Sequence, residues 1–232
     1  MLKKSLQNLF KLPSFGSQNI LNHSRKMANI HTVLKTNYKQ ETESQHSSIY
    51  LGMGCFWGVE RLFWNLDPKI IHTTSVGYSG GDDNKIKEVT YEYVCTGKSG
   101  HVEVVKVDYK KDENWENPAN LAKIVKAFWE NHDPTQGDRQ GNDRGTQYRS
   151  VIFCTEENQL EFAKKSKELM QIEIDQNPRY FAGSKITTEI SMFKNYYYGE
   201  EYHQQYLDKN PWGYCNLKGN GVTCPMPNRP KN

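Results

Sequence analysis

Short apolar runs alternate with amphipathic segments along most of the chain. Runs with the alternation or the β-branched content of strands predict strands over residues 47–53, 70–78, 101–109, 148–154 and 184–191. Apolar residues at helical spacing predict three helices: one from Cys55 to near Asp67-Pro68, one that opens at Asn117-Pro118, and one over residues 156–174. Strands and helices mixed in this order predict an α/β (α+β) two-layer sandwich.

The N-terminal end departs from this pattern. Residues 1–40 contain seven Lys or Arg and no Asp or Glu, and leucines at helical spacing precede Pro13. A basic, amphipathic leader without acidic residues is typical of mitochondrial transit peptides, although a disordered polar tail would also fit. We therefore place residues 1–45 outside the fold. We expect a mitochondrial protein, or a cytoplasmic one if translation starts at Met27.

The C-terminal end also lacks the periodicity of regular elements. Residues 211–232 are rich in glycine and proline, which predicts an irregular, flexible tail. The folded domain is therefore expected over residues 46–210, a length that suits one domain rather than two.

Composition excludes several classes of function. The net charge is only +3 with both signs interspersed, which argues against a nucleic-acid-binding protein. No apolar run approaches the roughly 18 residues of a membrane span. The five cysteines form no CxxC and no Cys/His pairing, so we expect no metal site. An odd cysteine count also differs from the disulfide framework of a secreted protein and suits a reducing compartment.

The stretch "GMGCFWGVERLFW" (52–64) places a cysteine where an apolar run becomes a helix. Unpaired N–H groups and the dipole at a helix N-terminus favour a thiolate, so Cys55 is a candidate nucleophile with a lowered pKa. Gly54 allows close approach of a substrate, and Phe56 and Trp57 provide an apolar wall. The alternative is an inert, buried cysteine.

A carboxylate falls on the apolar side of the clearest strand, "HVEVVKVDY" (101–109). Period-two alternation puts Glu103 on the same face as Val105, Val107 and Tyr109. Loss of solvation there would raise the pKa of Glu103 and keep it protonated, ready to donate a proton. The alternative is an edge-strand glutamate that faces water.

Five strings, in order, carry a resemblance to a known family: "GCFWG", "VGYSGG", "TYEYVCTGKSGHVEV", "FWENHDPTQGDRQGNDRGTQYRS" and "YHQQYLDKNPWGYC". From about Gly52 to Cys224 the chain resembles peptide methionine sulfoxide reductase, type A. The resemblance implies a ferredoxin-like core with a mixed sheet and an extended, coiled C-terminal segment. It also implies reduction of methionine S-sulfoxide, free or in oxidised proteins, by a monomer that needs thioredoxin as reductant and no metal or organic cofactor.

The resemblance implies a role for each matching residue. Cys55 would attack the sulfoxide sulfur and Glu103 would protonate its oxygen. The substrate-binding residues would be the aromatic wall, two hydroxyls that orient the oxygen, and one polar residue: Phe56, Trp57, Tyr91, Tyr148 and Asp143. Cys55 would become a sulfenic acid, and Cys215 and Cys224 would return it to the thiol through disulfides.

The other reactive side chains are expected to be structural. Cys95 is interpreted as a core thiol at a strand end, and Cys154 ends the predicted strand over 148–154. His101, His132 and His203 are interpreted as hydrogen-bonding scaffold. Two other functions would also use a reactive cysteine: a thiol peroxidase, and a non-enzymatic redox sensor or metal-binding module. A peroxidase would have no need of the Phe56-Trp57 wall, and the missing CxxC argues against metal.

Overall fold

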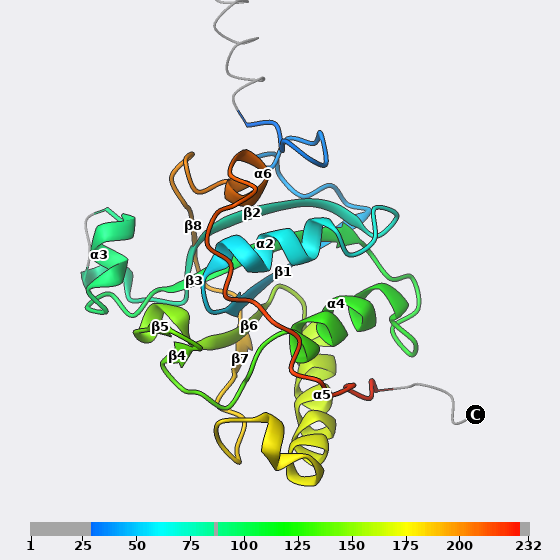
Figure 1. Ribbon diagram of the computed structural model, residues 1–232. Coiled ribbons are helices and arrows are strands. Elements are labelled where there is room, and N and C mark those ends of the chain that lie inside the picture. Colours follow the sequence, from blue (N-terminus) through cyan, green and yellow to red (C-terminus); the bar gives the residue numbers. More distant parts are fainter. Residues whose placement is uncertain (1–28, 86–87, 228–232) are drawn as a thin grey trace, which may run out of the picture.

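The structure is a computed structural model, which describes residues 29–85 and 88–227. Its centre is a six-stranded sheet in the order β7-β6-β1-β3-β2-β8 (Figure 1). The strands are β1 (His46–Met53), β2 (Ile71–Ser79), β3 (Val102–Lys110), β6 (Ser150–Cys154), β7 (Glu189–Met192) and β8 (Tyr196–Tyr198). All neighbours are antiparallel except β6 and β7.

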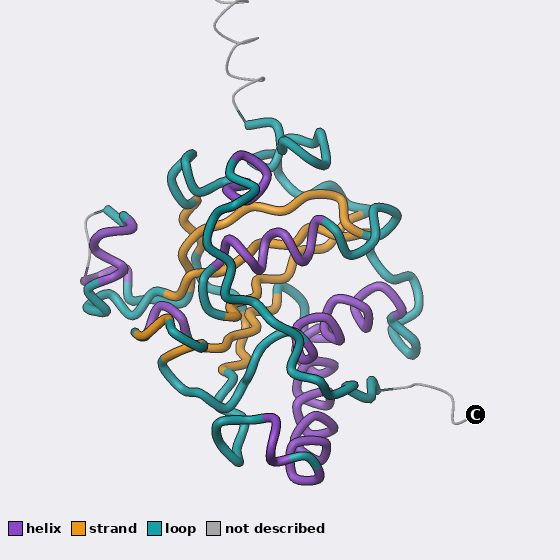
Figure 2. The backbone as a smooth tube through the Cα atoms, viewed as in Figure 1, coloured by secondary structure: helices purple, strands orange, loops and turns teal. Residues whose placement is uncertain are grey.

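Helices and short 3-10 turns connect the strands (Figure 2). The helices are α2 (Phe56–Trp64), α3 (Tyr91–Cys95), α4 (Ala119–Glu130), α5 (Glu157–Gln176) and α6 (Tyr206–Lys209). The 3-10 turns are Asp83–Lys85, Thr146–Tyr148 and Pro178–Tyr180, and β4 (Arg139–Gln140) pairs with β5 (Asp143–Arg144) in a separate hairpin.

The order β1-α2-β2-β3-α4-β6, with the strands side by side as β6-β1-β3-β2, is a ferredoxin-like core. Apolar faces of α2, α4 and α5 pack on one face of the sheet and form the larger hydrophobic cluster. The opposite face carries a smaller cluster, which Phe193 and Tyr196 cover. The predicted two-layer α/β sandwich with a mixed sheet is thus confirmed.

The alternation read from β3 is also confirmed. Val105, Val107 and Tyr109 belong to the helix-covered cluster, whereas Val102 and Val104 belong to the cluster on the other face. Adjacent side chains of a strand point to opposite faces. Glu103 therefore lies on the helix-covered side, beneath the start of α2.

The predicted strand over 184–191 is largely wrong, because β7 begins only at Glu189. Backbone groups that precede it are bound elsewhere. The Ile186 N–H donates to Gln171 Oε1 on α5, and the Thr187 N–H donates to the Pro134 carbonyl. With these partners the segment satisfies its polar groups without a neighbouring strand.

The exclusion of residues 1–45 from the fold is wrong for residues 29–45. His31 and Tyr38 are buried, and the Tyr198 hydroxyl on β8 donates to the Tyr38 carbonyl at 3.1 Å. His and Tyr occur both in cores and on solvated surfaces, so the sequence pattern alone does not show that His31 and Tyr38 are buried. The basic start that suggested a leader lies outside the described residues.

The expected irregularity of the tail is confirmed for its described part. After α6 the chain crosses α2 and reaches α4 in extended and turn conformations (Figure 1). Asn220 fixes this course, because its side-chain amide donates to the Trp129 and His132 carbonyls at 2.6 and 3.0 Å. Those carbonyls lie at the C-terminal end of α4, where helices leave acceptors unpaired.

Candidate active site

Cys55 occupies the turn between β1 and α2. It is the N-cap residue of α2, with φ −55° and ψ 120°, and its side chain is half-buried. Gly54 makes this turn possible, since its φ of +89° is strained for any residue with a Cβ. A Cβ at Gly54 would also lie 2.7 Å from Gln140, so the backbone can approach the hairpin only as glycine.

The surroundings of Cys55 raise the pKa of its thiol. Burial is the largest cause, the charge of Glu103 adds to it, and the Trp57 backbone N–H opposes both. The sequence-based expectation of a lowered pKa is therefore wrong for this structure, because desolvation outweighs the helix N-terminus. Cys55 rests as a thiol, and its proton must leave as the sulfur attacks.

Glu103 contacts the backbone turn that carries this thiol. Its Oε2 accepts a hydrogen bond from the Phe56 backbone N–H at 3.1 Å, and the residue is only 1% exposed. Its pKa is raised to about 8, mainly by burial; the Phe56 N–H opposes this rise, and the charges of Asp143 and Glu200 add to it. The prediction that burial would raise the pKa of this carboxyl group is confirmed, so at neutral pH Glu103 can donate a proton.

The two aromatic residues after Cys55 differ in their surroundings. Phe56 is buried against Tyr78 and His203, with ring centroids 5.9 and 5.1 Å away. Trp57 is only half-buried, and its ring stacks on Tyr206 at 3.9 Å with 17° between the planes. Trp57 therefore supplies the accessible part of the wall, and Phe56 supports it from the core.

Residues of the segment before α6 hold this wall; the scaffold role predicted for His203 is confirmed, whereas the role of Glu200 was not predicted. Trp57 Nε1 donates to His203 Nδ1 at 3.1 Å, so the imidazole fixes the rotation of the indole. Glu200 accepts from the Tyr78 hydroxyl at 2.7 Å and from the Tyr91 N–H at 2.9 Å. The tyrosine-rich composition was the visible signal, but side-chain partners cannot be read from it.

Tyr91 and Tyr148 approach the pocket from α3 and from the 3-10 turn Thr146–Tyr148. Burial raises the pKa of both hydroxyls, and the charge of Glu103 raises each further. The two hydroxyls form a hydrogen bond with each other, and the charge of an ionised Cys55 would also raise the pKa of Tyr148. The structure thus places both tyrosines, as protonated hydrogen-bond donors, near the carboxyl group of Glu103, and Tyr148 also near the Cys55 thiol.

Asp143, on β5, connects the pocket to the tail. The Tyr214 hydroxyl donates to its Oδ1 at 3.0 Å, and Asn216 Nδ2 lies 3.3 Å from its Oδ2. Cys215 sits between these two contacts and is near enough to Cys55 to affect its pKa. A Cβ on Gly58 would lie 3.0 Å from Cys215 Sγ, so this glycine lets the second thiol rest against α2.

Cys224 packs against α4, away from Cys55 and Cys215. It is 1% exposed, and its backbone N–H donates to Glu130 Oε1 at 2.9 Å. Lys126, Glu130 and Glu173 are the charges around it. Both Cys215 and Cys224 are free thiols. The structure therefore brings Cys215 to Cys55 but does not bring Cys224 there.

The side chains expected to be structural fall into two groups. Cys154 is buried in β6, and His132 binds the Phe128 carbonyl and Ser150 Oγ at 2.8 Å each, so both serve the core. The Nε2 atom of His101 lies 3.5 Å from Oδ1 of Asp83. The expectation of a core thiol at a strand end is wrong for Cys95, which is the last residue of the helix α3 and is half-buried. Its thiol interacts with Tyr91 and Gln147.

Two absences hold for the described residues. Within residues 29–85 and 88–227, no three His, Cys, Asp or Glu side chains gather as metal ligands would. Over the same part of the chain, no helix is long and apolar enough to cross a membrane.

Comparison with known proteins gives the family. The family model of peptide methionine sulfoxide reductase matches residues 47–226. The curated peptide methionine sulfoxide reductase MsrA of Photobacterium profundum is 50% identical over 194 residues, which cover 83% of this chain and 85% of that protein. The MsrA of Vibrio cholerae is 52% identical over 183 residues, which cover 79% of this chain and 80% of that protein.

Solved structures agree. Methionine sulfoxide reductase A of Corynebacterium diphtheriae aligns with a TM-score of 0.69 at 39% identity, over 86% of this chain and 90% of that chain. Reduced Mxr1 from Saccharomyces cerevisiae aligns with a TM-score of 0.65 at 35% identity, over 76% of this chain and 92% of that chain. The thiol, carboxyl group and aromatic wall described above lie within the matched region, and the chain belongs to the peptide methionine sulfoxide reductase family.

Proposed function

We propose that the chain reduces the S epimer of methionine sulfoxide, free or in oxidised proteins, to methionine, with Cys55 as nucleophile. The observation that carries the assignment is the contact between Glu103 and the first N–H of α2. In this contact the carboxyl group of Glu103, from β3, binds the backbone turn that carries the Cys55 thiol. A sulfoxide held against Trp57 would then meet the sulfur and the acid together.

The chemistry balances with these two groups. Cys55 Sγ bonds to the sulfoxide sulfur while Glu103 gives its proton to the oxygen, and Tyr91 and Tyr148 hold that oxygen by hydrogen bonds. The thiol proton restores Glu103. The oxygen then passes to Cys55 Sγ as methionine leaves, so a thiol and a sulfoxide become a sulfenic acid and a thioether. No net proton is consumed, which suits a pocket that disfavours both anions.

Cys215 would attack the sulfenic acid, with water as the leaving group, and form a disulfide with Cys55. Cys224 would then attack that disulfide and move it to the Cys215–Cys224 pair. Thioredoxin, a dithiol protein, would supply two electrons and two protons to restore the thiols, and no organic cofactor or metal is needed. Because Cys224 rests on α4, the second exchange requires this part of the tail to leave that helix.

The location in the cell follows from the leader. We infer that the basic N-terminal leader directs the protein to mitochondria, because residues 1–40 contain seven Lys or Arg and no acidic residue. A product that starts at Met27 would lack this signal and stay in the cytoplasm.

Purified protein with dithiothreitol should be assayed on both epimers of a blocked methionine sulfoxide and on hydrogen peroxide. We expect turnover of the S epimer only. Turnover of peroxide at a similar rate, or of the R epimer, would contradict the assignment. Cys55→Ser should remove the activity, whereas Cys154→Ser, which changes a core thiol, should keep it.

A further inference from the structure

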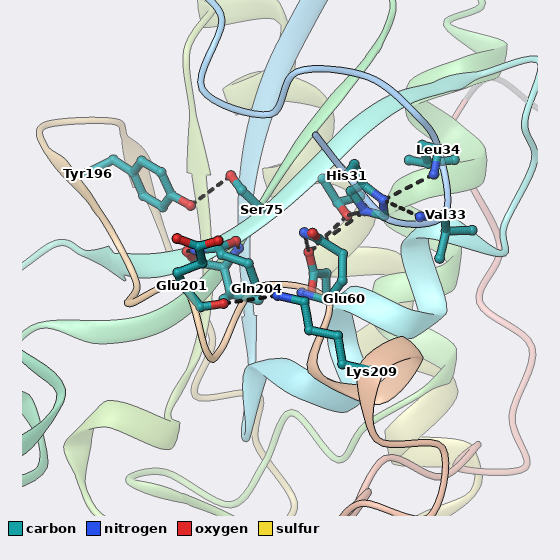
Figure 3. Close-up of polar contacts among 12 residues, drawn as sticks. His31, Val33, Leu34, Glu60, Ser75, Tyr196, Glu201, Gln204 and Lys209 are labelled. Carbon is teal, nitrogen blue, oxygen red and sulfur yellow. Dashed lines mark hydrogen bonds and ion pairs between the residues drawn. The ribbon is translucent and has the colours of Figure 1, made fainter. Parts of the chain in front are cut away.

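A buried chain of hydrogen bonds lies beside α2, outside the pocket that holds Cys55. It begins at His31, passes through Thr74 on β2 to Glu60 on α2, and ends at Gln205 before α6. His31 and Glu60 are fully buried, and Gln205 is 1% exposed. Figure 3 shows the first part, with His31 between the backbone of Val33 and Leu34 and the carboxyl group of Glu60.

The hydrogen bonds fix the tautomer of His31. Its Nδ1 accepts from the Val33 and Leu34 N–H groups at 3.1 Å each, so the ring proton is on Nε2. Nε2 donates to Thr74 Oγ1 at 2.8 Å, and the Thr74 hydroxyl donates to Glu60 Oε1 at 3.2 Å. Each hydrogen bond in this series therefore has a defined donor, and all of them point from His31 through Thr74 to Glu60.

The carboxyl group of Glu60 stabilises an unusual backbone conformation at Gln205. Gln205 has φ 49° and ψ 40°, in the left-handed region that residues with a Cβ rarely adopt. Glu60 Oε2 accepts the Gln205 N–H and Glu60 Oε1 accepts the Gln205 Nε2, both at 2.8 Å. The carboxyl group thus stabilises a turn that the residue itself disfavours.

That turn sets the position of the aromatic wall. Gln205 is the N-cap residue of α6, and the next residue, Tyr206, stacks on Trp57 at 3.9 Å. If the Gln205 backbone relaxed, the Tyr206 ring would move relative to the indole. The position of Trp57 is therefore connected to a residue near the start of the described chain, 26 positions before it.

We propose that His31 is a positioning residue for the sulfoxide pocket, and that residues 29–38 form a positioning segment. His31 touches no reacting atom. It acts through Thr74, Glu60 and the Gln205 turn on Tyr206 and thereby on Trp57. This inference rests on the proposed function, because the wall matters only if a substrate methyl group binds there.

The test uses the full chain with dithiothreitol as reductant, which removes the thioredoxin step. The variants are His31→Ala and Thr74→Val, the latter in case loss of the ring prevents folding. A wall that holds the substrate equally in the ground and transition states affects KM more than kcat. We expect KM for methionine S-sulfoxide to rise about tenfold with kcat changed less than about twofold, the factor that loss of one good hydrogen bond gives.

A double-mutant cycle separates this role from simple stabilisation. If His31 acts through Tyr206, His31→Ala should raise KM about tenfold in the wild type but less than about twofold in a Tyr206→Ala background. Gln40→Ala, an exposed position two residues beyond the segment, is the control and should change neither constant.

The outcomes are distinct. A lower Tm with unchanged KM in both His31→Ala and Thr74→Val would overturn the proposal and make the segment purely structural. An equal effect of His31→Ala in both backgrounds would also overturn it. Absence of sulfoxide reduction in the wild-type chain would instead refute the proposed function.

Discussion

Replacing Glu103 with glutamine tests the proton donor directly. The amide keeps the shape and can still accept from the Phe56 N–H through its oxygen, so binding should change little. It cannot give a proton to the sulfoxide oxygen. A positioned proton transfer is typically worth about 10²–10⁴ in rate, and we expect the first turnover to slow by that factor.

The raised pKa adds a second signature. With a pKa of about 8, Glu103 is protonated in about 90% of molecules at pH 7. The first-turnover rate of the wild type should therefore fall as the pH rises through about 8. The slow residual rate of the glutamine variant should lack this fall, because its amide does not titrate.

Stability should follow the same group. The pKa of Glu103 is higher in the folded chain, about 8, than its ordinary value of 4.5, so the folded state keeps a proton that the unfolded state loses. Its contribution to stability is complete below about pH 4.5 and is lost as the pH rises through about 8. Between these limits the free energy of unfolding of the wild type should fall, relative to that of Glu103→Gln, by up to about 1.4 kcal/mol for each unit of pH.

The assays are single-turnover quench with excess enzyme, and thermal unfolding of both proteins from pH 5 to 9. A glutamine variant whose first turnover matches the wild type would rule out proton donation by Glu103. A difference in Tm between the two proteins that does not change with pH would show that the carboxyl group is ionised throughout, and the reasoning from burial would fail.

The remaining predictions concern the thiols and the leader. Cys55→Ser should retain the fold by circular dichroism and lose S-sulfoxide reduction, and residual turnover above about 1% would be too high for loss of a nucleophile. Cys215→Ser should reduce about one equivalent of substrate and then stop with thioredoxin as the sole reductant; continued turnover would contradict the relay. Asn220→Ala should free the tail from α4 and speed alkylation of Cys224 about tenfold, since Asn220 binds the carbonyls of Trp129 and His132 at the end of that helix. A fusion of residues 1–45 to a reporter should enter mitochondria, and a diffuse cytosolic signal would refute the targeting prediction.

Hydrophobic periodicity was sufficient to predict the core strands and helices and the face of the sheet on which Glu103 lies. Alternation in β3 is a local property, because each side chain's face follows from its position in the strand, and so Glu103 could be placed on the covered side. The helix start at Cys55 was likewise a local pattern. The predicted pKa of Cys55 was wrong because it depends on how deeply the surrounding residues bury the thiol, which the sequence around it does not contain.

The parts that could not be predicted depend on partners distant in the chain. His203 binds Trp57 from 146 positions away, and Glu60 binds Gln205 from 145 positions away. Neither pair has a periodic signature. Residues 29–40 were assigned to the leader because they share its lack of acidic residues. The packing of this segment depends instead on the hydrogen bond between His31 and Thr74, which forms only in the folded protein.

The two contacts that flank Cys215 have a kinetic consequence. Because Tyr214 and Asn216 both bind Asp143, the thiol between them is confined to a small volume near Cys55 rather than sampling the reach of a free tail. Even a flexible tether gives an effective concentration of roughly millimolar, and an oriented one gives far more. A sulfenic acid formed on Cys55 would therefore meet Cys215 before it met a diffusing thiol or a second oxidant molecule. The Asp143 contacts would thus protect the nucleophile from irreversible oxidation to the sulfinic acid.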